Sequence, residues 1–186
     1  MLSDKLELVM SVLDDPRVAV ETIVLKRPVL FSILVFALAN LSILVSHLIG
    51  AGAGGEHFVM KFILYVAFDA AVMVLCSCVL HFTAGLLNGR GDIVSLYSLL
   101  NFSLTPLLLL IPVSLIGRLA GAEIGFLLTA FLYCWALGFV IYAVETLYGV
   151  HAGAAAAIVF SPLIAVMLLF FAVSVLIFGT VVALIL

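Results

Sequence analysis

The sequence predicts an all-α integral membrane protein, in which a bundle of five transmembrane helices follows an amphipathic N-terminal segment. Hydrophobic residues make up 67% of the 186 residues and charged residues only 9%, whereas soluble domains are nearer half apolar and a quarter charged. So short a chain cannot hide this much apolar surface from water. The apolar residues also fall into runs that match the ~20 residues a helix needs to cross a bilayer.

Residues 1–27 form a polar, amphipathic leader to the apolar part of the chain. Ser3 is a candidate N-cap for a first helix, whose apolar residues recur at helical spacing: Leu6, Val9, Met10 and Leu13. Asp15 as N-cap and Pro16 at the first helical position then predict a second helix. We expect two short helices on the cytoplasmic membrane surface, with their apolar face among the lipid headgroups.

Five apolar stretches are candidate spans, and we expect residues 1–186 to form a single membrane domain around them. Pro162 divides the long apolar C-terminal stretch into a lead-in and a last span. The expected spans cover about 29–49, 58–82, 94–116, 124–147 and 163–186.

The basic residues predict the orientation of the bundle, because cytoplasmic loops carry an excess of Lys and Arg. If the N-terminus lies inside and the C-terminus outside, five of the seven Lys and Arg residues are cytoplasmic: Lys5, Arg17, Lys26, Arg27 and Arg90. Only Lys61 and Arg118 then lie outside, which favours this orientation.

Asp69 is the carboxylate that most needs an explanation, because it lies near the middle of the second span. An ionised carboxylate there costs about 2.5–3.5 kcal/mol, so it is protonated, paired or in contact with water. Asn40 and Thr105 lie at similar depth in the first and third spans, and all three side chains are expected to meet. Such a cluster is either a proton or cation site, or a set of interhelical hydrogen bonds.

Two prolines interrupt the third span. Pro106 lacks the amide that would bond the carbonyl of Phe102, and Pro112 has the same effect on Leu108. Free backbone groups within a membrane must find partners in neighbouring helices or line a cavity. We therefore expect this span to be kinked and to face the bundle, either for packing or as a hinge or ligand cleft.

The cytoplasmic ends of the spans collect His81, Glu145 and the loop Asn88–Asp92. Glu145 needs a partner near the membrane, and Arg90 is the nearest candidate. The run Gly89-Arg90-Gly91 indicates a tight turn between helices. Its amides, beside an arginine at the membrane face, are also suited to lipid headgroups.

The sequence contains no motif of an enzyme, a metal site or a nucleic-acid-binding protein. There is no nucleophile with a positioned base and no Walker, GxSxG or HExxH pattern. The three cysteines lack metal-ligand spacing, and no basic run suggests nucleic acid. We expect a non-enzymatic protein without cofactor or metal.

Several of these features together resemble the Yip-domain family, the Ypt/Rab-interacting membrane proteins, in its short prokaryotic form. They are Asp15-Pro16 followed by a helix and Pro28, the stretch from His81 through Gly91, Pro106, and Glu145 through Gly149. This sequence departs from the family pattern at one position of a glycine pair in this loop, where it has Asn88. The resemblance implies five spans, a cytoplasmic N-terminus and a non-enzymatic role. It also implies the cell membrane of a prokaryote.

Two functions are compatible with these observations. The first is a membrane scaffold or adaptor, which presents residues 1–27 and the Asn88–Asp92 loop to a partner protein or to lipid headgroups. The second is a small oligomeric transporter or channel that uses Asp69 together with Asn40 and Thr105. Contacts between copies of the chain are expected through the small residues Gly179 and Ala183.

Overall fold

The computed structural model describes residues 2–51 and 57–185, and these residues are helical throughout except for short connections. Five of the helical segments are long and apolar enough to cross a membrane, which confirms the predicted all-α fold. The elements are α1 Leu2–Asp14, α2 Pro16–Lys26, α3 Val29–Ala51, α4 Phe58–Leu86, α5 Ile93–Ser103, η1 Thr105–Leu109, α6 Leu110–Ala120, α7 Ala122–Tyr148 and α8 Ala152–Ile185.

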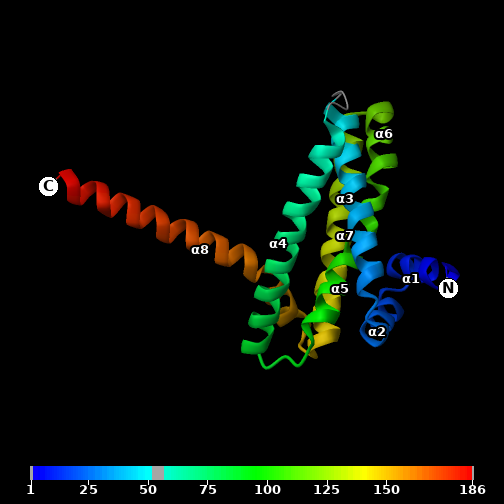
Figure 1. Ribbon diagram of the computed structural model, residues 1–186, viewed down its shortest axis with the longest axis horizontal. Coiled ribbons are helices and arrows are strands. Elements are labelled where there is room, and N and C mark those ends of the chain that lie inside the picture. The colour runs from blue at the N-terminus through cyan, green and yellow to red at the C-terminus, as the bar shows by residue number, and fades with distance from the viewer. Residues whose placement is uncertain (1, 52–56, 186) are drawn as a thin grey trace.

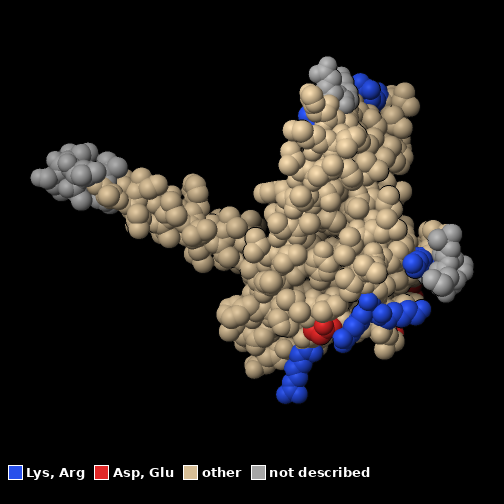
Figure 2. Space-filling model, viewed as in Figure 1, with Lys and Arg blue, Asp and Glu red and all other residues tan. Residues whose placement is uncertain are grey.

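Helices α3, α4 and α7 and the composite span α5–η1–α6 stand side by side as a bundle, and α1 and α2 pack beside its lower part (Figure 1). We call the end at which α4 and α7 finish and α5 and α8 begin the basic end. Figure 2 shows most of the visible Lys and Arg side chains around α1, α2 and this end, with fewer at the opposite end. The charge asymmetry expected from the sequence is therefore an asymmetry of the folded bundle.

The α1–α2 corner forms through local chemistry. Asp15 Oδ1 accepts hydrogen bonds from the amides of Arg17 and Val18 at 3.2 and 3.3 Å, and Pro16 opens the helix. Asp15 is therefore the N-cap that satisfies two of the first free amides of α2. Helix α1 begins at Leu2, so Ser3 lies inside the helix and is not its cap.

Helices α1 and α2 are apolar on two sides. The stripe expected to face the headgroups is exposed only in part: Leu6 is 59% and Met10 54% accessible, whereas Val9 packs against the buried core. A second set, which includes Val12 and Ile23, is fully buried against α3, α5 and α7. The helices are thus docked onto the bundle by one face and leave other apolar side chains exposed.

The third span is interrupted at Pro106, where the 3₁₀ segment η1 separates α5 from α6. The carbonyl of Phe102 accepts a hydrogen bond from Thr105 Oγ1 at 2.7 Å. The carbonyl of Leu108 accepts one from Ser42 of α3 at 3.1 Å. Both carbonyls that the prolines leave free therefore have partners, one within the span and one on a neighbouring helix.

Helix α8 differs from the sequence prediction. It runs without a break through Pro162, so the expected division into a lead-in and a separate span is wrong. Its first part packs on α4 and α7 through the buried Ala155 and Ile158. Its later part leaves the bundle (Figure 1), and its large apolar side chains from Leu163 to Phe178 are exposed.

The spans do not begin at the same height at the basic end. Asn101 Nδ2 donates to Ser32 Oγ at 3.1 Å, which aligns the eighth residue after the start of α5 with the third residue after the start of α3. At 1.5 Å per residue, these offsets are about 12 and 4.5 Å. Helix α3 therefore starts about 7 Å above the start of α5, at the height where α1 and α2 pack.

Candidate functional site

Tyr148, the last residue of α7, is the centre of the basic end. It is 4% exposed, and its hydroxyl lies 2.7 Å from Nδ1 of His81 on α4. Gly149 then ends α7 in the left-handed conformation (φ 65°), with its amide bonded to the carbonyl of Glu145. These contacts join the ends of two spans through a buried tyrosine.

The loop after α4 is set by Asn88, whose φ is +61°. The amide of Asn88 bonds the carbonyl of Gly85 at 3.1 Å, and the amide of Gly89 bonds that of Ala84 at 2.9 Å. This pair of bonds is a Schellman motif, which needs a left-handed residue after the helix. Asparagine adopts that conformation more readily than most side chains, so Asn88 can take a position that favours glycine.

Gly89 and Gly91 are required because the loop backbone lies directly on the Tyr148 ring. A Cβ atom on Gly91 would lie 2.6 Å from Cε1 of that ring and 3.0 Å from Cγ of Leu147. A Cβ atom on Gly89 would lie 3.0 Å from Cβ of Tyr148. The glycines that the sequence indicated as a tight turn therefore also permit close packing of the loop on α7.

Asp92 closes the loop in two ways. Its carboxylate caps α5 by accepting from the amides of Val94 and Ser95 at 3.0 and 3.2 Å. It also pairs with Arg27, at the end of α2, at 3.5 Å. Partial burial raises the pKa of Asp92, but hydrogen bonds from Ser95 and Val94 and the charge of Arg27 outweigh it, so the pKa lies below its usual value.

Arg90 lies at the exposed tip of the loop, and only its backbone is engaged, by a 3.3 Å bond from its amide to the carbonyl of Tyr148. No ion pair joins Arg90 to Glu145 in the part of the chain that the structure describes. The expected pairing is therefore wrong, and the cationic partner at this end is Arg27, which pairs with Asp92. The Arg90 guanidinium remains available at the surface.

The three polar residues expected at mid-span are not joined by any hydrogen bond between described residues. Asn40 and Thr105 are fully buried, but each bonds a carbonyl of its own segment, that of Phe36 and that of Phe102. The hydrogen bond between α3 and α5 is instead the one from Asn101 to Ser32. Asp69 does not take part in this buried seam.

Asp69 is half-buried on α4, eight residues from Lys61 and twelve from His81. These separations correspond to about 12 and 18 Å along the helix, so the carboxyl lies within the apolar belt. It forms no ion pair with a described residue.

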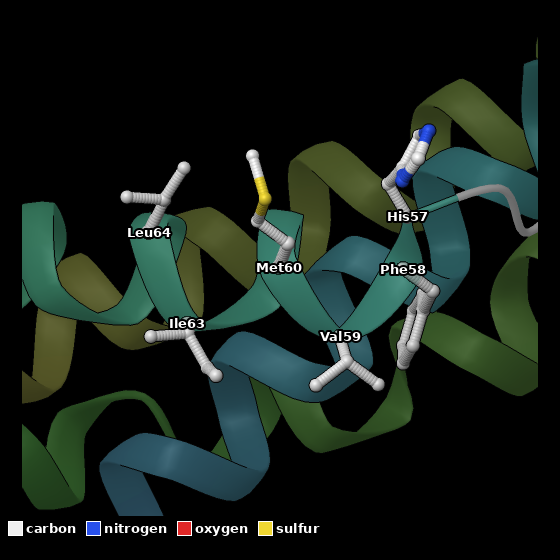
Figure 3. Close-up of a pocket in the computed structure, with 6 residues that line it drawn as sticks. All are labelled: His57, Phe58, Val59, Met60, Ile63 and Leu64. Atoms are coloured by element: carbon white, nitrogen blue, oxygen red, sulfur yellow. The ribbon is translucent and has the colours of Figure 1, made fainter.

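No metal centre is present among the described residues. They contain no group of three or more His, Cys, Asp or Glu that could hold an ion. A hollow of about 620 Å³ lies along the first two turns of α4, from His57 to Leu64. Figure 3 shows that its side chains fan out from one helix and do not converge, so it is part of the outer surface.

Several residues that organise this end were not singled out by sequence reasoning. Tyr148 was included only as part of a longer stretch, and neither its contact with His81 nor the Arg27–Asp92 pair was foreseen. Asp92 carried a usable signal, because an aspartate directly before an apolar helical run is a typical N-cap. The contacts of Tyr148 bring together residues 67 positions apart and had no local signal.

The helical bundle, with five helices long and apolar enough to cross a membrane, defines a polytopic α-helical membrane protein. The family model described as Yip1 domain matches residues 10–174, which is most of the chain. The protein therefore belongs to the Yip1-domain family, as its resemblance had indicated. Comparisons with curated proteins and with solved structures found no significant match.

Proposed function

We propose that this protein is a non-enzymatic membrane scaffold, which binds a partner protein at its basic end. The observation that carries the proposal is the rigid presentation of Arg90. The loop is held by a Schellman motif, by close packing on Tyr148 and by the Arg27–Asp92 pair, while the Arg90 side chain itself is exposed. A preformed loop of this kind lowers the entropic cost of binding.

A neighbouring hollow extends this surface. It has a volume of about 360 Å³, lies between α2 and the end of α7, and is lined by Glu21, Val24, Leu25, Thr146 and Leu147. Leu25 is 84% exposed. Leu147 also approaches Gly91, so the hollow adjoins the loop. An apolar side chain in the hollow and a carboxylate on Arg90 are the partner features that this surface fits.

The orientation belongs to the same proposal. The excess of Lys and Arg at the basic end supports a cytoplasmic location for α1, α2 and the loop, with the C-terminus outside. The resemblance to short prokaryotic members of the family supports the cell membrane of a prokaryote. A partner would then be either a cytoplasmic protein or a different membrane protein with a cytoplasmic face.

The test is co-purification from source membranes in native lipid, followed by mass spectrometry. We expect a protein in stoichiometric amount, whose recovery falls at least about tenfold with Arg90→Glu, because a reversed charge opposes the partner carboxylate. Arg118→Glu, at the opposite end, is the matched control and should leave recovery unchanged. Recovery that is equal in both variants, or a chain that purifies alone, contradicts the proposal.

The second candidate function is a small oligomeric transporter or channel, which Asp69 favours. Its carboxyl lies in the apolar belt without an ion pair to a described residue, and such residues commonly mark ion or proton paths. The α3–α5 seam adds Asn40 Oδ1 and Asn101 Oδ1, which are buried without hydrogen-bond partners among the described residues. Unpaired acceptors of this kind suit water or a cation.

The two functions separate through Asp69→Asn, which keeps the shape and hydrogen-bonding capacity of the side chain but removes its titrating proton. A scaffold should keep its partner and its stability with this variant. A proton-coupled transporter should lose flux in liposomes that carry a pH gradient. Flux that depends on Asp69 would favour the second candidate over the first.

A further inference from the structure

A second groove lies between the start of α2 and the middle of α7. Its volume is about 450 Å³, within the range of small-molecule sites. Asp15 and Arg17 line it on the α2 side, and Trp135, Gly138 and Tyr142 line it on the α7 side. It is separate from the surface proposed for the protein partner and does not depend on that function.

The groove changes from polar to apolar along the direction of the membrane normal. Tyr142 lies six residues before the end of α7, or about 9 Å from the basic end. This is close to the height at which α3 begins and the charged α1–α2 corner packs. Trp135 lies seven residues farther along α7, about 10 Å deeper in the apolar belt. A molecule that fills the groove therefore needs a polar head and an apolar tail.

The polar end offers one charge of each sign. Asp15 uses Oδ1 to cap α2, which leaves its second oxygen exposed. Arg17 meets Glu21 only through Nε, at 3.5 Å, and its side chain is 77% exposed. Such a surface pair contributes little, and the terminal guanidinium nitrogens remain available. An arginine next to a carboxylate is complementary to a head that carries a phosphate and an ammonium group.

The apolar end is shaped for a chain. Gly138 is exposed, and a Cβ atom placed on it would meet no atom within 4 Å, so the backbone forms a notch. The Trp135 ring beside the notch is held edge-on by Phe131, one turn away, with ring centroids 5.6 Å apart. A fixed aromatic wall and an open notch on one helix face together form a channel for an acyl chain.

We propose that this groove binds one zwitterionic aminophospholipid, with its phosphate on Arg17, its ammonium on Asp15 and one acyl chain in the Gly138 notch beside Trp135. The α1–α2 corner would then be fixed on the bundle partly by lipid. The paired charges favour a zwitterionic head over an anionic one, which would meet Asp15 without a counter-charge, and the N–H groups of a primary ammonium, which choline lacks, can donate to Asp15.

Trp135 is the only tryptophan of the chain, so its fluorescence reports directly on the groove. The full chain is reconstituted in phosphatidylcholine vesicles that contain a lipid with brominated acyl chains, over the same series of mole fractions for each lipid. The brominated lipid is in turn a phosphatidylethanolamine, a phosphatidylcholine or a phosphatidylglycerol. We expect the phosphatidylethanolamine to quench Trp135 with an apparent affinity about two- to fivefold higher than the others, the size of two exposed charge contacts.

Two variants test the assigned contacts. Asp15→Asn keeps the cap, because asparagine caps helices as well as aspartate does, and Arg17→Gln removes the cation. Each should reduce the headgroup preference to within the range of non-specific lipid contact, while Arg118→Gln at the opposite end should leave it intact. Because the headgroup series on the unaltered chain already tests the proposal, a variant that fails to fold does not remove the test.

Two outcomes overturn the proposal. Equal quenching by the three brominated lipids would show that ordinary surrounding lipid fills the groove. Stronger quenching by phosphatidylglycerol would show that the site selects anionic lipid and that Asp15 does not contact the head. Neither outcome bears on the protein partner, whose test depends on Arg90.

Discussion

The hydrogen bond from Ser42 to the carbonyl of Leu108 provides the sharpest test of how the interrupted span is stabilised. Pro112 has no amide to offer this carbonyl, and Ser42 Oγ lies 3.1 Å from it. Ser42 is 2% exposed, so the Ser42→Ala variant leaves a buried acceptor without its partner. An unsatisfied group of this kind costs about 1–3 kcal/mol.

The measurement is the free energy of unfolding of purified protein in mixed micelles, titrated with a denaturing detergent. We expect Ser42→Ala to lower it by about 1–3 kcal/mol. Ser174→Ala is the matched control, because Ser174 bonds a carbonyl of its own helix on the exposed part of α8. This change should stay within about 0.5 kcal/mol.

A double-mutant cycle identifies the cause. Pro112→Ala restores an amide four residues after Leu108, so the carbonyl then has a backbone donor within reach. In that background Ser42→Ala should cost less than it does in the unaltered chain, and the difference measures the coupling. If Ser42→Ala costs the same in both backgrounds, or no more than Ser174→Ala, the carbonyl does not need Ser42 and the reasoning is refuted.

Three further predictions concern the two ends of the bundle. Gly91→Ala should destabilise the protein by about 1–3 kcal/mol, because its methyl group overlaps the Tyr148 ring under the loop. Gly85→Ala is the control and should not destabilise, because no atom lies within 4 Å of its new Cβ. Equal stability of the two variants in a detergent titration would contradict this. Gly117→Ala should also destabilise the protein, because its Cβ would lie 2.9 Å from the Cα of Gly125, a backbone atom that cannot move away as a side chain can. If its unfolding midpoint matched that of Gly85→Ala, close packing of α6 on α7 would be contradicted. The pKa of Asp92 is lower in the folded state than in the unfolded state, where it is about 3.8. Its ionised form therefore contributes stability above the unfolded pKa, and this contribution is lost as the pH falls through the folded pKa. The difference in unfolding free energy between the unaltered chain and Asp92→Asn should narrow in acid, and a difference that is constant with pH would show that the charge is not involved.

Much of the fold was predictable because the relevant forces are local. The apolar runs specify helices and their number, and Asp15-Pro16 specifies the start of α2 through a cap and a missing amide. The carbonyls of Phe102 and Leu108 lose their usual donors because Pro106 and Pro112 have no amide hydrogen, which follows directly from the sequence. Pro162 was misjudged by the same rule, since a proline within a membrane helix does not always end it.

The candidate site was less predictable, because a membrane helix is apolar on the side that faces lipid and on the side that faces protein. Periodicity then gives little information about which face packs. The set of Leu6, Val9, Met10 and Leu13 was recognised as one apolar face, but Val12, which is fully buried on the bundle, lies outside that set. Arg90 was placed correctly on the loop and incorrectly paired with Glu145.

The sequence by itself determined that this protein has five helices long and apolar enough to cross a membrane, that the third of them loses two backbone hydrogen bonds, and that its loop after α4 is rich in glycine. Only the tertiary structure decided what each feature contacts: Ser42, 66 residues away, for the carbonyl of Leu108, the ring of Tyr148 for Gly91, and Arg27 for Asp92. The physical reason is that propensity, capping and hydropathy act between chain neighbours, whereas the partner of a freed carbonyl, a glycine or a charge depends on how whole helices dock.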